Sequence, residues 1–160
     1  MSFPTDSETV VVHRGEGASV TAGGSRCIFK LTGRDTNDRF GLFELTMAPR
    51  AMGATPHTHH ELIEIFYVLE GQVEFLTGDQ RVIGRPGTLV SVPPETVHAF
   101  ANTSDVTATM LLMFCPADAR EKYFEDLAEL TKDGRKPEHH EIGALMRRFD
   151  SELVEGISFP

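Results

Sequence analysis

The stretch that decides the fold is GATPHTHHELIEIFYVLEG, residues Gly53–Gly71. It holds His57 and His59 two residues apart, in what we read as an extended segment. Side chains two residues apart on an extended chain leave the same face, so both imidazoles can converge on one metal ion at about 2.1 Å. Glu64 follows five residues after His59 and opens an apolar run that reads as a strand. Its carboxylate would add an oxygen ligand.

A second histidine-bearing stretch, GTLVSVPPETVHAFAN, covers Gly87–Asn102. It places His98 on a separate predicted strand, after a bend fixed by Pro93. Three imidazole nitrogens and one carboxylate oxygen suit a divalent transition metal (Fe, Mn, Ni, Cu, Co or Zn), whereas Ca and Mg prefer all-oxygen sites. The candidate metal ligands are therefore His57, His59, Glu64 and His98.

Apolar residues alternate along most of the first two-thirds of the chain, with short Gly-, Pro- and Asn-containing turns between the segments. Strands with such close-set turns predict an all-β fold, an antiparallel sandwich or barrel. The predicted strands are Val10–Val12, Arg26–Leu31, Phe40–Met47, Glu64–Leu69, Gln72–Leu76, Thr88–Val92, Val97–Ala101 and Thr107–Phe114.

The pattern changes from alternation to helical spacing at Pro116. Residues 118–132 carry an amphipathic stripe that Asp133-Gly134 ends. We expect a second helix with Pro137 as its first residue. The predicted organisation is a β-barrel domain over residues 1–115, with an N-terminal strand, and a helical extension over 116–160 packed on the barrel.

Together the two stretches resemble the two motifs of the cupin superfamily, in its small single-domain form. The first matches as His-x-His, four residues, Glu, six residues and Gly; the second matches as Gly, five residues, Pro, then His and Asn. Gly53 lies closer to His57 than in the family pattern, and Glu95 takes a position that is usually glycine. The resemblance implies a jelly-roll barrel that holds a divalent metal on the four candidate ligands.

The resemblance also implies a metal-dependent enzyme acting on a small organic substrate, aromatic or enolic, by dioxygenase-type chemistry. Phe66 shares a strand face with Glu64, and Phe100 shares one with His98, so both are predicted to line an apolar pocket. Met47 is a third candidate for that wall, and Glu64 is a candidate proton acceptor. A Lewis-acid isomerase, lyase or polyketide cyclase stays open, as does a non-catalytic protein that binds or senses a small molecule.

Composition limits the partners further. With 15 Lys and Arg against 24 Asp and Glu, the net charge is −9, which argues against nucleic acid and anionic membranes. Residues Met1–Asp6 lack the features of a secretory signal, no apolar run is long enough to span a membrane, and only Cys27 and Cys115 are cysteines. We therefore expect a cytoplasmic protein. The resemblance further implies a homodimer, in which Thr9–Val12 could cross to a partner's sheet.

Overall fold

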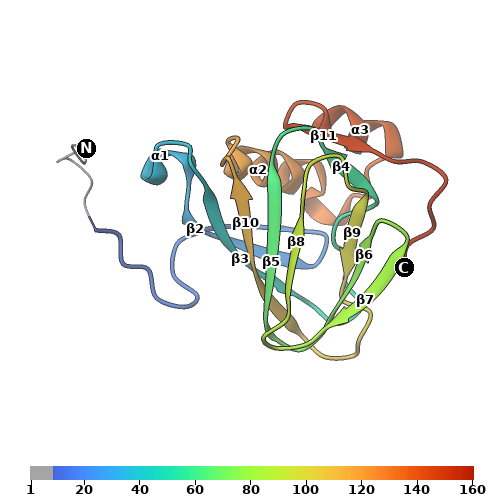
Figure 1. Ribbon diagram of the computed structural model, residues 1–160, viewed down its shortest axis with the longest axis horizontal. Coiled ribbons are helices and arrows are strands. Elements are labelled where there is room, and N and C mark those ends of the chain that lie inside the picture. Colours follow the sequence, from blue (N-terminus) through green and yellow to red (C-terminus); the bar gives the residue numbers. More distant parts are fainter. Residues whose placement is uncertain (1–8) are drawn as a thin grey trace.

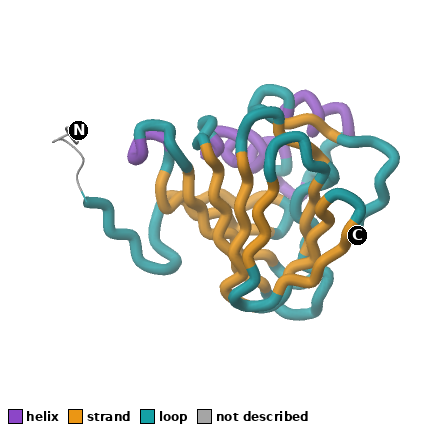
Figure 2. The backbone as a smooth tube through the Cα atoms, in the orientation of Figure 1, coloured by secondary structure: helices purple, strands orange, loops and turns teal. Residues whose placement is uncertain are grey.

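The computed structural model describes residues 9–160, which form two antiparallel sheets packed face to face with two helices at one end (Figures 1 and 2). One sheet has the strand order β1-β2-β3-β10-β5-β8 and the other β11-β4-β9-β6-β7. The all-β jelly-roll barrel with C-terminal helices is confirmed. The strands are β1 Ala18–Ala22, β2 Ser25–Leu31, β3 Gly41–Met47, β4 His57–His59, β5 Ile63–Glu70, β6 Val73–Thr77, β7 Gln80–Gly84, β8 Leu89–Val92, β9 His98–Ala101, β10 Ala108–Cys115 and β11 Ser151–Leu153.

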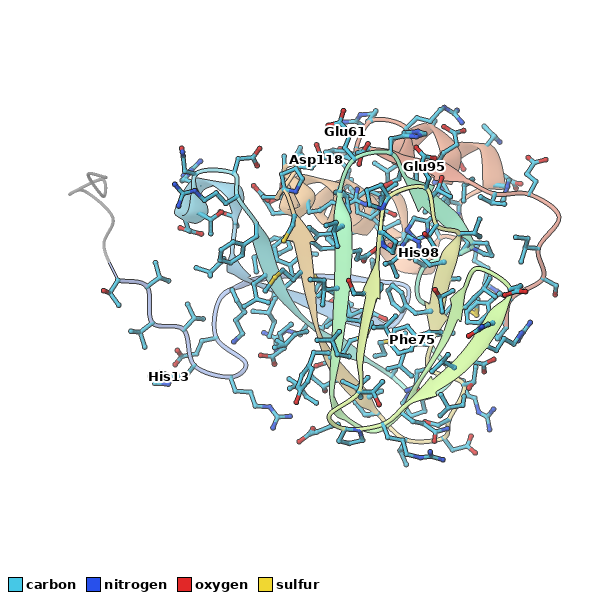
Figure 3. All side chains as sticks on the ribbon, viewed as in Figure 1. His13, Glu61, Phe75, Glu95, His98 and Asp118 are labelled. Carbon is cyan, nitrogen blue, oxygen red and sulfur yellow. The ribbon has the colours of Figure 1, made fainter. Side chains whose placement is uncertain are left out.

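The core lies between the two sheets and is built from the inward faces of the alternating strands. Phe66 of β5 meets Phe75 of β6 and Phe100 of β9, with ring centroids 5.2 and 5.3 Å apart, so aromatic side chains join one sheet to the other. Figure 3 shows Phe75 and His98 within the body of the barrel, with His13 far from both. The candidate ligands thus start from strands that the apolar core holds in place.

Three strands carry no alternating signal and were not predicted. β1 has one large apolar residue, Val20, in ASVTA, and β7 (QRVIG) is mostly exposed. A two-residue Gly78-Asp79 turn pairs β7 with β6. β11 has only three residues, too few to show a period, and pairs with β4.

The predicted strand Val10–Val12 is wrong. This segment has no regular secondary structure, and Val10 and Val11 are 48% and 72% exposed. An apolar triplet forms a strand only when a neighbouring strand accepts its backbone hydrogen bonds, and no strand within residues 9–160 pairs with this segment.

Two helices, α2 (Arg120–Leu130) and α3 (His139–Met146), follow the barrel; a short helix α1 (Gly33–Thr36) lies earlier, and a 3₁₀ turn covers Lys132–Gly134. Pro137 is not the first residue of α3, because Glu138 caps the helix through a capping box with Glu141. Buried side chains from α2, α3 and the segment after α3 form their own cluster: Tyr123, Leu145, Met146 and Phe149.

The segment after α3 returns to the barrel, where β11 extends the five-stranded sheet. The division of the chain at residue 115 stays a prediction. Across residues 9–160, none of the helices has the length and apolarity needed to cross a bilayer. The expectation based on Met1–Asp6 lies outside the described residues.

Candidate metal centre

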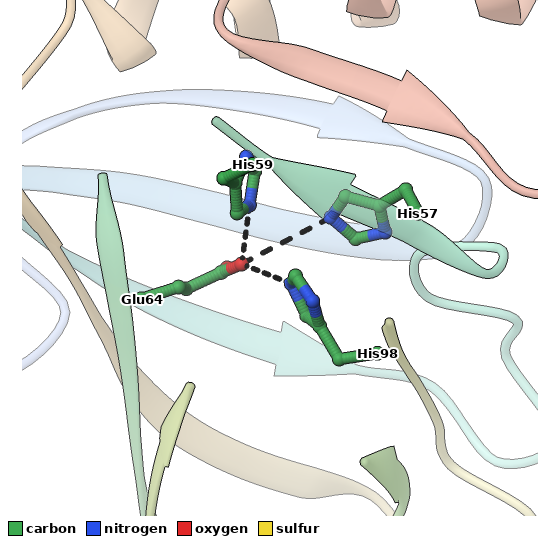
Figure 4. A group of neighbouring side chains, drawn as sticks. All are labelled: His57, His59, Glu64 and His98. Atoms are coloured by element: carbon green, nitrogen blue, oxygen red, sulfur yellow. Dashed lines mark hydrogen bonds and ion pairs between the residues drawn. The ribbon is translucent and has the colours of Figure 1, made fainter. Parts of the chain in front are cut away.

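The four predicted ligands come together inside the barrel (Figure 4). His57 and His59 point inward from β4, with exposures of 4% and 2%. His98 on β9 lies directly opposite His57 in the strand pairing, and Glu64 enters from β5 in the other sheet. The two-residue spacing read from the sequence therefore places both β4 imidazoles on the interior face.

The distances within this group match those around a single ion. The Oε2 atom of Glu64 lies 2.8 Å from His98 Nε2, 2.9 Å from His59 Nε2 and 4.0 Å from His57 Nε2. Metal–ligand bonds of about 2.1 Å place neighbouring ligand atoms about 3 to 4 Å apart. All four side chains are buried.

Each imidazole is oriented through its other nitrogen. His57 Nδ1 lies 2.7 Å from the Thr55 carbonyl oxygen, and His98 Nδ1 lies 2.9 Å from that of Thr96. His59 Nδ1 lies 3.0 Å from the carbonyl oxygen of Asp150. A carbonyl oxygen only accepts hydrogen bonds, so Nδ1 of His57 and of His98 carries the proton and their Nε2 atoms present a lone pair. His59 Nδ1 faces a donor as well, because Arg120 Nη2 lies 3.2 Å from it.

This tautomer makes the group fit a cation. A neutral imidazole has one N–H, so with the proton on Nδ1 the Nε2 lone pair of His98 faces the lone pairs of Glu64. Either extra protons or a metal cation must lie between them. A metal cation accepts lone pairs from the imidazole nitrogens and the carboxylate oxygen at once. The donor set and its orientation therefore suit a divalent transition metal.

Burial dominates the ionisation of this group. It lowers the pKa of His57 well below its usual 6.5, and the neighbouring His98 and His59 lower it further. Burial alone would raise the pKa of Glu64, but the adjacent His59 and His98 outweigh it and hold this pKa well below 4.5. Near neutral pH His57 is neutral and Glu64 is ionised, the states in which both side chains bind metals.

A layer behind the ligands comes from the C-terminal part of the chain, and sequence reasoning missed it. Arg120, at the start of α2, donates from Nη1 to the Phe149 carbonyl oxygen (2.6 Å) and from Nη2 to Ser151 Oγ (2.8 Å). The Asp150 carboxylate accepts the backbone N–H groups of Glu61 and Leu62, each at 3.0 Å. The loop between β4 and β5 is thereby fixed by a residue far along the chain.

An apolar cavity of about 150 Å³ adjoins the centre. His57 and Glu64 form part of its wall, with Arg120 and Ser151 at the polar end. Of the three residues predicted to line it, Phe100 does so, whereas Phe66 and Met47 are packed in the core, 1% and 0% exposed, and do not belong to the described wall. Glu64 and Leu45 project from the same strand faces two residues earlier and do line the cavity, so Phe66 and Met47 differ from the wall residues by their position along the strand.

Two departures from the family pattern have local explanations. Glu95 adopts a left-handed backbone conformation with φ of 62°, where glycine is the usual residue. Its carboxylate lies 3.1 Å from His60 Nδ1, and both side chains are exposed, so neither belongs to the buried group. Gly53 packs so closely on Phe100 that a Cβ there would lie 2.3 Å from the ring.

Comparison with known proteins agrees with this architecture. Residues 43–114 match the cupin domain family Cupin_2. Quercetin 2,3-dioxygenase from Bacillus subtilis (strain 168) is 28% identical over 105 residues, which cover 66% of this chain and 31% of that protein. The chain thus spans about a third of the length of this curated relative.

Solved structures share the barrel. The polyketide cyclase RemF from Streptomyces resistomycificus superposes with a TM-score of 0.59 at 24% identity, covering 68% of this chain and 80% of that one. KdgF from Halomonas sp. superposes with a TM-score of 0.60 at 18% identity, covering 68% and 94%. At such identities the likeness concerns the fold alone. Residues 43–114 match the family model and hold all four motif ligands, so this part of the chain is a cupin domain.

Proposed function

We propose that this cupin is a metal-dependent enzyme that holds a divalent transition metal on His57, His59, Glu64 and His98 and acts on a small organic substrate by dioxygenase-type chemistry. One observation carries the proposal: three buried imidazoles have Nδ1 fixed on carbonyl oxygens, so their Nε2 atoms face one carboxylate beside an apolar cavity. The relation to quercetin 2,3-dioxygenase supports the reaction type.

The size of the cavity limits the substrate. A cavity of about 150 Å³ is the volume in which a protein interior takes up a single benzene ring. A three-ring flavonol such as quercetin exceeds it, so we expect a one-ring or similarly small enolic molecule. Met52 lines the cavity and is 46% exposed, which makes it the side chain at the entrance.

The chain's own residues supply positioning and proton transfer. A bound ion would polarise an oxygen donor of the substrate and, with Fe, Mn, Ni or Cu, allow reaction with dioxygen. Glu64 is ionised and lies on the cavity wall, so its carboxylate is the group that accepts the proton of a substrate hydroxyl or enol. The apolar side chains on the wall, among them Leu45, Phe100 and Phe124, exclude water around the reacting atoms.

The test is to load the purified protein separately with Fe, Mn, Ni, Cu and Zn, measure metal stoichiometry, and follow oxygen uptake with catechols, 1,3-diketones and flavonols. We expect about one ion per chain and oxygen uptake with a redox-active metal and a one-ring substrate. Substrate conversion with Zn and without oxygen uptake would assign Lewis-acid chemistry instead. Tight reversible binding without conversion would make the protein a binding module.

A matched pair of variants tests the ligand assignment. His59→Ala removes a buried candidate ligand, whereas His60→Ala removes its exposed neighbour, which contacts Glu95. We expect metal content to fall severely in the first variant and to stay at the wild-type level in the second. Equal metal content in both would refute the assignment.

A further inference from the structure

Arg120 is a buried cation with which no carboxylate of residues 9–160 forms an ion pair, although its charge opposes the rise that burial causes in the pKa of the nearby Asp118. Its side chain is 3% exposed, and its guanidinium lies 5.2 Å from the Phe114 ring centroid and 4.9 Å from that of Tyr123. Its polar contacts go to the Phe149 carbonyl oxygen, to Ser151 Oγ and to His59, and none of these groups is a carboxylate. The Nε atom is buried and has no hydrogen-bond partner.

Such an arrangement is costly unless something compensates for it. Neutral acceptors satisfy single N–H groups but do not neutralise the charge of the guanidinium. Burying a charge without a counter-ion costs on the order of several kcal/mol. A charge retained under these conditions points to an anion that is bound during function. Arginine is well suited to this task, since its planar fork binds a carboxylate through two parallel hydrogen bonds.

The guanidinium lies on the cavity wall at the end where the candidate metal ligands lie. Its Nη2 atom is 3.5 Å from His59 Nε2, the nitrogen that faces Glu64. Among the residues that line the cavity, Arg120 is the only lysine or arginine. A ligand that enters the cavity and reaches the candidate centre therefore meets this one fixed cation.

The charge balance of the centre also favours an anionic ligand. A divalent ion with the Glu64 carboxylate would leave one surplus positive charge, and Arg120 adds a second. The carboxylates of Asp118 and Asp150 lie nearby but do not line the cavity, so a ligand inside it meets Arg120 and Glu64 as the charged side chains of the described wall. An anionic ligand would restore the balance.

We infer that Arg120 binds an anionic oxygen of the substrate, and that the substrate class is small organic anions of about one-ring size, carboxylates above all. This inference rests on the proposed function, because it takes the cavity beside the centre as the substrate site. It assigns to Arg120 a role in substrate selection, separate from the metal ligands.

The test compares benzoate with its neutral isostere benzamide by NMR titration of metal-free and Zn-loaded protein. In metal-free protein the ionised Glu64 on the cavity wall opposes anion binding equally in wild type and in an Arg120 variant, so the comparison of the two isolates the contribution of Arg120. We expect benzoate to bind metal-free wild type at least about tenfold more tightly than benzamide, the ratio of a charge-assisted hydrogen bond. Equal affinities, or no benzoate binding, would overturn the inference.

Arg120→Gln should bring the benzoate-to-benzamide ratio close to one while benzamide affinity hardly changes. Arg148→Gln is the matched control, since Arg148 is largely exposed and pairs with Asp126, and it should keep the wild-type ratio. An unchanged ratio in Arg120→Gln refutes the role of Arg120; if this variant does not fold, the wild-type ratio decides. Failure to take up Zn would refute the metal centre and leave the metal-free titration valid.

Discussion

The tightest contact beside the cavity gives a sharp test of the packing. In Gly53→Ala the new Cβ would lie 2.3 Å from the Phe100 ring and 2.4 Å from the Phe100 carbonyl oxygen. Ordinary contact begins near 3.4 Å, so both the ring and the backbone of β9 must move. That backbone is held by pairing with β6 and by the hydrogen bond from Phe100 N to the Ala54 carbonyl oxygen.

Overpacking of this kind costs about 1–3 kcal/mol, and we expect the upper end, about 3 kcal/mol, because a rigid backbone atom is involved. For a chain of this length the melting temperature should fall by roughly 6–12 °C. Differential scanning calorimetry or urea unfolding measures the change.

Gly41→Ala is the matched control, because a Cβ there would lie 3.5 Å from Phe43, an ordinary contact. Its unfolding free energy should stay within about 0.5 kcal/mol of wild type. Equal stability of the Gly53→Ala and Gly41→Ala variants would refute the claim that close packing against Phe100 excludes a Cβ atom at position 53.

Three further predictions concern stability. The stability of metal-free protein should fall as the pH drops below about 6.5, because burial keeps His57 neutral in the folded state while the unfolded chain takes up a proton there. It should fall again below about 4.5, because Glu64 stays ionised in the folded state while the unfolded chain protonates it. A flat melting profile between pH 8 and 4 would contradict this. A metal ion at about a thousand times its dissociation constant should raise the free energy of unfolding of the wild type by about 4 kcal/mol, measured by thermal shift. The His59→Ala variant should lose this stabilisation, and the His60→Ala variant should keep it. Phe66→Ala should lower the free energy of urea unfolding by about 3–5 kcal/mol, since its ring is 1% exposed between the sheets; a loss under 1 kcal/mol, on the order of a surface change, would refute its core role.

The candidate centre was predictable where short-range geometry determines it. The alternation of an extended chain places His57 and His59 on one face, and the structure buries both. These residues alone do not show which strands pair with each other. The second family motif nevertheless identified His98, which the structure places opposite His57.

The groups behind the ligands were not predictable, because their partners lie far apart in the chain. Helical spacing predicted α2 but gave no sign that Arg120, at its first turn, would point into the barrel. Ser151 and Asp150 reach His59 only because the three residues of β11 pair with β4. A segment that short has no periodic signal, so its contribution emerges only in three dimensions.

The pairing of β11 with β4 has a consequence for the order of events during synthesis. The carbonyl oxygen of Asp150 fixes the ring of His59, although the two residues are separated by 91 positions. Both motifs leave the ribosome before residue 150 does. Until Asp150 has followed, the imidazole of His59 lacks this carbonyl oxygen and can rotate. The orientation of this candidate ligand is therefore complete only after the last strand of the five-stranded sheet has joined the barrel.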